Sequence, residues 1–90
     1  MGFKKRRGVR RSYDEQGLIY FTCKCYRLQP ECVQKKILAL CERAGGENAE
    51  ALFVFLTTHV SRERILEEYH IGSETTLYRA VKRFFEGWEM

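Results

Sequence analysis

The last third of the chain contains a stripe of apolar side chains at helical spacing. They recur at intervals of four, three and four residues: Leu77, Val81, Phe84 and Trp88. This spacing places them on one face of an α-helix. Ser73 comes just before the pattern and can accept a hydrogen bond from a free amide of the first turn. We therefore predict an amphipathic helix over about residues 73–87 that buries one face in a core.

A shorter helix is predicted immediately before this one. Ser61 is a second capping residue, and the apolar residues after it fall within one turn of each other: Ile65, Leu66 and Tyr69. Gly72 supplies a conformationally permissive residue between the two helices. Residues 61–87 are thus expected to form two helices joined by a tight turn.

The exposed face of the longer helix is polar and basic. It carries Thr75, Thr76, Tyr78, Arg79, Lys82, Arg83 and Glu86. The helix then has an apolar back and a hydrogen-bonding front, and such a front can reach base edges in a DNA groove.

Residues 69–72, followed by residues 76–79, resemble a known DNA-binding motif. They are similar to the helix-turn-helix of site-specific recombinase DNA-binding domains, of sigma-factor region 4 and of small phage transcription regulators from Gram-positive bacteria. The likeness covers about a quarter of the chain. In those families the start and middle of the second helix contact bases. The resemblance implies base contacts at Ser73, Thr75, Thr76 and Arg79.

Positive charge is concentrated at the start of the chain. The chain has 16 Lys and Arg against 12 Asp and Glu, and the first twelve residues hold Lys4, Lys5, Arg6, Arg7, Arg10 and Arg11. Closely spaced like charges with little apolar content predict a flexible basic arm over residues 1–11. Such an arm suits phosphate contacts, although a solubilising tail is the simpler alternative.

Together these features predict a sequence-specific binder of double-stranded DNA, a transcriptional regulator of a phage or mobile element. The helix at 73–87 would enter the major groove, with Arg79 contacting guanine. Backbone contacts are expected from the six bases of the arm and from Tyr78, Lys82 and Arg83. A homodimer through apolar surface near Phe85, Trp88 and Met90 is left open, with closure of the core by Trp88 as the alternative.

Two other functions fit the same residues. Acids beside the expected groove helix would repel phosphate, which favours a helical protein-interaction module that binds RNA polymerase or a repressor: Glu67, Glu68, Glu74 and Glu86. RNA binding through the arginine-rich arm is the other alternative. An amphipathic helix pair also occurs in many all-α domains that bind no nucleic acid.

Residues 12–90 are expected to form a single all-α domain, a small bundle of four to five helices. Ser12 and Glu15 fit a capping box, although residues 18–28 also suit a strand. Pro30 suits the first turn of a second helix that ends at Gly45-Gly46. Asn48 can cap a third helix whose apolar run, residues 51–56, suggests a central place in the core.

Metal binding, catalysis and membrane insertion are not favoured. The cysteines lack the paired spacing of zinc motifs, so core packing is preferred and zinc left as the alternative: Cys23, Cys25, Cys32 and Cys41. No phosphate-binding glycine loop or nucleophile elbow is present, so we expect neither an enzyme nor a cofactor. The absence of a long apolar run or a secretory signal predicts a cytoplasmic protein without a membrane span.

Overall fold

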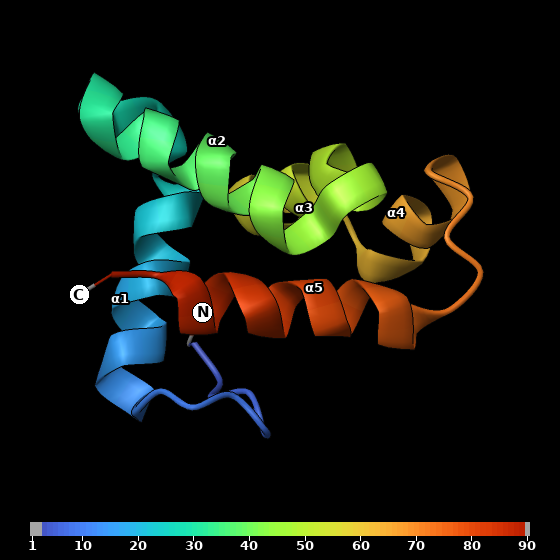
Figure 1. Cartoon of the computed structure of the whole chain (residues 1–90), viewed down its shortest axis with the longest axis horizontal. Helices are drawn as coiled ribbons and strands as arrows, with labels where there is room; N and C mark the ends of the chain where they lie inside the picture. Colours follow the sequence, from blue (N-terminus) through green and yellow to red (C-terminus); the bar gives the residue numbers. More distant parts are fainter. Residues whose placement is uncertain (1–2, 90) are drawn as a thin grey trace.

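The computed structural model describes residues 3–89, and every regular element in this range is helical (Figure 1). The helices are α1 (Tyr13–Lys24), α2 (Glu31–Gly45), α3 (Ala49–Thr57), α4 (Arg62–Glu68) and α5 (Glu74–Gly87), with 3₁₀ turns η1 (Tyr26–Leu28) and η2 (Gly46–Asn48). The expected all-α fold is confirmed. The run at 18–28 is helical too, divided between α1 and η1.

Three serines begin helices as predicted. Glu15 N donates to Ser12 Oγ (3.1 Å) while Ser12 N donates to Glu15 Oε1 (2.9 Å), which completes the capping box of α1. Ser61 Oγ accepts from Arg64 N (3.3 Å) at α4, and Ser73 Oγ accepts from Thr75 N (3.1 Å) at α5. Each bond satisfies an amide that the helix itself leaves unpaired.

The turn between α4 and α5 differs from the expectation. Its left-handed residue is His70, with a φ of 54°, and not Gly72. His70 N donates to Glu67 O (3.3 Å) and Ile71 N donates to Leu66 O (2.9 Å). This is the Schellman arrangement, in which the residue after the helix cap is left-handed. Ile71 is buried in an apolar cluster against which Leu66 also packs.

The other glycine prediction is correct. α2 ends at Gly45, and Gly46 follows as its cap, with a φ of 55° in the left-handed region. Asn48, expected to cap the following helix, makes no side-chain capping bond, because it is the last residue of η2 and its backbone is already turning.

Two apolar clusters hold the helices together. The larger joins α1, α2, α3 and α5 and contains the expected stripe residues Val81, Phe84 and Trp88. The smaller joins α3, α4 and α5 through Ala51, Ile65, Ile71 and Leu77. α5 therefore packs into both clusters along its length, which fixes the direction of its exposed face.

The expected dimer surface beside the end of α5 is wrong. Phe85 is fully buried and Trp88 is 7% exposed, because both pack in the larger cluster. Lys36 lies over the Trp88 ring, with Nζ 4.2 Å from the ring centre. Met90, the third residue of that prediction, lies outside the described residues.

The cysteines divide into two pairs. Cys23 and Cys41 are buried in the core, as predicted, but Cys25 and Cys32 are exposed, so core packing is wrong for that pair. Cys25 is the residue that follows α1, and Cys32 lies in the first turn of α2, beyond the core. Within residues 3–89, no three His, Cys, Asp or Glu side chains converge on a point that could hold a metal ion. The described helices are all too short or too polar to cross a bilayer.

Candidate nucleic-acid interface

α5 presents a polar stripe away from both clusters. Thr75, Arg79 and Lys82 follow one another at spacings of four and three residues, and all three are exposed. Thr76 is exposed beside this stripe. Ser73 is exposed as well, but its hydroxyl is the cap of the helix.

The N-terminal arm lies beside this stripe and forms the other wall of a groove. A cavity of about 580 Å³ is lined by Lys4, Lys5, Arg6, Arg7, Val9, Thr75, Tyr78, Arg79 and Lys82. Bases from segments some 70 residues apart in sequence therefore face the same space. Such a gathering of cations with no acid among the lining residues produces a strongly positive local potential.

Gln16 holds the arm in place. This side chain is completely buried on the inner face of α1. Its Oε1 accepts from Arg6 N (2.8 Å), while its Nε2 donates to Arg6 O (3.3 Å) and Arg11 O (3.1 Å). One amide group thus provides hydrogen-bond partners for three backbone groups of the arm, which would otherwise need water as a partner.

Arg6 is the anchor of the arm rather than a solvent-facing cation. Its guanidinium lies over the rings of Phe55, Tyr78 and Phe85, at 5.5, 5.8 and 6.0 Å from the ring centres. Burial lowers the pKa of Arg6, because desolvation disfavours the charged form. The aromatic faces supply a cation–π attraction in place of the lost water.

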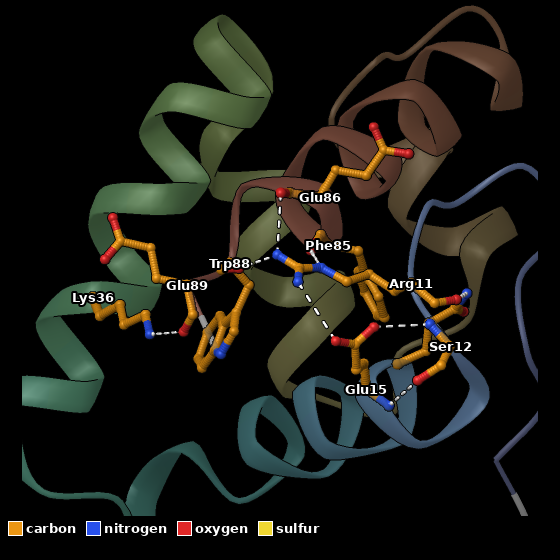
Figure 2. Close-up of polar contacts among 9 residues, drawn as sticks. Arg11, Ser12, Glu15, Lys36, Phe85, Glu86, Trp88 and Glu89 are labelled. Carbon is orange, nitrogen blue, oxygen red and sulfur yellow. Dashed lines mark hydrogen bonds and ion pairs between the residues drawn. The ribbon is translucent and has the colours of Figure 1, made fainter.

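Arg11 caps the carboxyl end of α5 (Figure 2). Its Nε donates to Phe85 O (3.1 Å), and its Nη2 donates to Glu86 O (3.2 Å) and to Trp88 O. Nη1 also lies 3.9 Å from Glu15 Oε2. A cation is favourable at this end of a helix, where the last carbonyls have no partner in the helix itself.

Two other residues of α5 that were predicted to contact the DNA backbone have hydrogen-bond partners within the protein. Arg83 Nε donates to Ala44 O (2.9 Å), which satisfies a carbonyl in the last turn of α2. The hydroxyl of Tyr78 accepts from Arg62 Nη1 (2.6 Å), and Arg62 Nε lies 3.3 Å from Glu74 Oε2. The hydrogen bond to Tyr78 raises the pKa of Arg62. Arg62 therefore fastens the start of α4 to the first turn of α5.

The predicted bases fall into two groups by position. Lys4, Lys5, Arg7, Arg10, Arg79 and Lys82 are exposed, whereas Arg6 and Arg11 are half-buried and stack or donate within the fold, and Arg83 is exposed but donates to Ala44 O. Sequence reasoning missed Gln16 and Arg62. The signal for Gln16 was its spacing of three and seven residues from Ile19 and Cys23, which places an amide on an apolar face. No family model, curated protein or solved structure matches the chain.

Proposed function

We propose that the protein binds double-stranded DNA in a sequence-specific manner, as a transcriptional regulator of a phage or mobile element acting in the cytoplasm. The observation that carries the proposal is the groove in which exposed bases of the arm and of α5 line the same 580 Å³ space. α5 would enter the major groove, and the arm would follow the adjacent phosphates.

The side chains of α5 would divide this work. Arg79 is exposed in the middle of the helix, and its planar guanidinium can donate two hydrogen bonds to one guanine. Thr75 and Thr76, one turn earlier, can contact bases or phosphates. Lys82 follows one turn later and would contact the backbone. Ser73, by contrast, would use its backbone more than its hydroxyl, since that hydroxyl caps α5.

The exposed bases of the arm would supply affinity and salt dependence. Lys4, Lys5 and Arg7 each release condensed counterions when they neutralise a phosphate, and this gain is independent of base sequence. Because Gln16 and Arg6 hold the arm against the body, these cations are presented at a fixed position beside α5. A pre-positioned arm loses less conformational entropy on binding than a flexible one.

Three of the four acids that favoured a protein partner have a partner on the surface of the protein itself. Glu74 pairs with Arg62, Glu68 Oε1 accepts from Arg64 Nε (2.8 Å), and Glu86 Oε2 accepts from Arg10 N (2.9 Å). The charges of Glu74 and Glu68 are partly offset by the arginines they pair with, so their repulsion of phosphate is reduced. This supports the DNA proposal over the protein-interaction alternative.

Selection from a random duplex library at two salt concentrations tests the proposal. Arg79→Ala should weaken binding to the selected motif by about 1–3 kcal/mol and relax preference at one base pair. Lys5→Ala should weaken all sequences alike and lower the salt slope by about one. Arg43→Ala is the matched control, because Arg43 is exposed on α2 and does not line the groove.

Four results would refute the proposal or redirect it. Failure to enrich any motif, or unchanged binding by Arg79→Ala, would contradict the role given to α5. If structured RNA competes more strongly than duplex DNA, and that competition depends on the arm, RNA binding through the arm is supported instead. Capture of RNA polymerase or a repressor without DNA binding would support the protein-interaction alternative.

A further inference from the structure

The outer face of α1 is apolar and uncovered. Ile19 and Cys23 face the core, but on the opposite side Leu18 is 57% exposed and Phe21 is 49% exposed. The same face continues through exposed Cys25 to Leu28, which is 85% exposed in η1. These four residues, which we call the α1 seam, follow at spacings of three, four and three. Leu18 and Phe21 lie on α1 itself at a spacing by which two helices pack side by side, and Cys25 and Leu28 extend the apolar surface over the helix cap and η1.

A base and an acid lie at opposite ends of the α1 seam. Asp14 precedes it by one turn, and Arg27 lies at its end, and both are exposed. Neither side chain forms an ion pair among residues 3–89, because the salt bridges in this range join other residues. The seam therefore carries unneutralised charges of opposite sign at its two ends.

These charges select one kind of partner. In an antiparallel pair of α1–η1 segments centred on Phe21, the start of α1 in one copy, which carries Asp14, lies at the same end of the contact as η1 of the other copy, which carries Arg27. Asp14 then meets the other copy's Arg27, and symmetry provides this contact twice. A parallel pair would instead place acid against acid and base against base. Antiparallel packing also brings opposite helix dipole ends together.

We propose that a second copy of this chain covers the α1 seam, in an antiparallel two-fold dimer with Phe21 at its centre. Such an interface is self-complementary, as a two-fold contact must be. Large aromatic and aliphatic side chains at the centre would supply the affinity, and the Asp14–Arg27 contacts at the rim would set the orientation.

This dimer would leave the basic groove accessible. In Figure 1 α1 lies at one end of the longest axis, while the amino end of α5 and helix α4 lie at the other. The seam residues are also absent from the groove lining. The dimer proposal therefore stands independently of DNA binding, and each can fail without the other.

Sedimentation of the full chain over a range of concentrations tests the dimer. The wild-type mass should rise toward twice 10.7 kDa as concentration increases. Phe21→Glu should weaken association by about tenfold or more, as expected for a central contact. Leu38→Glu is the matched control, because Leu38 is an apolar residue 42% exposed on α2, outside the seam. Circular dichroism of each variant establishes that it folds.

Charge reversal tests the orientation without altering apolar surface. Asp14→Lys and Arg27→Glu should each weaken association, because each brings like charges together. The double variant should restore it, since the pair is re-formed with reversed signs. A chain that stays monomeric, an unchanged Phe21→Glu variant or a double variant weaker than both single variants would overturn the proposal.

Discussion

Replacing Arg11 by methionine should destabilise the fold by about 2–3 kcal/mol. The guanidinium donates to three carbonyls at the carboxyl end of α5, and its side chain is only 18% exposed. A single hydrogen bond that involves a charged group makes a net contribution of about 1.5–3 kcal/mol to stability. The three share one group at a partly solvated helix end, so they do not add, and water can replace some of them.

Methionine is a suitable replacement because its unbranched side chain is about as long as the aliphatic stem of arginine and lacks the guanidinium. The loss therefore reports on the guanidinium more than on packing. In a domain of this size, 2–3 kcal/mol corresponds to a fall in Tm of about 10–20 °C. Thermal and urea unfolding of the purified variant measure both quantities.

Arg10→Met is the matched control, because the Arg10 side chain is exposed and only its backbone N contacts Glu86. That variant should stay within about 0.5 kcal/mol of the wild type. An Arg11→Met variant as stable as the control would refute the capping role. Arg11 would then be interpreted as an exposed basic residue, as predicted from the sequence.

Two further predictions concern buried groups. Gln16→Leu should free the arm, because it leaves backbone groups of Arg6 and Arg11 unpaired. Limited proteolysis should then cleave faster before residue 12. An unchanged cleavage rate would contradict the role of Gln16 in holding the arm. Burial raises the pKa of Cys23 and of Cys41 to about 12, so their thiols favour the folded state fully below pH 9 and lose that contribution as pH rises toward 12. The free energy of unfolding, measured with urea, should fall between pH 8 and pH 10.5. This fall should be about 1–2 kcal/mol smaller in Cys23→Ala than in the wild type, and an equal fall in both would contradict the raised pKa of Cys23.

The elements that could be predicted from the sequence depend on local contacts. Ser12, Ser61 and Ser73 each bond to an amide two or three residues away, so the residue type and its position were sufficient. His70 shows the limit of such reasoning. Glycine is the usual left-handed residue, but here hydrogen bonds of the helix end and packing of Ile71 impose that conformation on histidine.

The candidate site was only partly predictable, because charge alone does not show where a side chain finds its partner. Arg79 was expected to be exposed and is, since its neighbours on α5 determine its face. Arg6 and Arg11 carry the same positive charge as the other basic residues of the arm. They nevertheless contact aromatic rings and carbonyl groups contributed by distant helices. Periodicity within one segment carries no information about such contacts.

The contacts of Arg11 also determine when the arm can dock. The carbonyls that it meets come 74 to 77 residues later in the chain. A ribosome must therefore complete α5 before these bonds form, and closing so long a loop is slow compared with forming a helix. Docking of the arm should thus be a late folding event, and a newly made chain would expose its basic segment until α5 has packed.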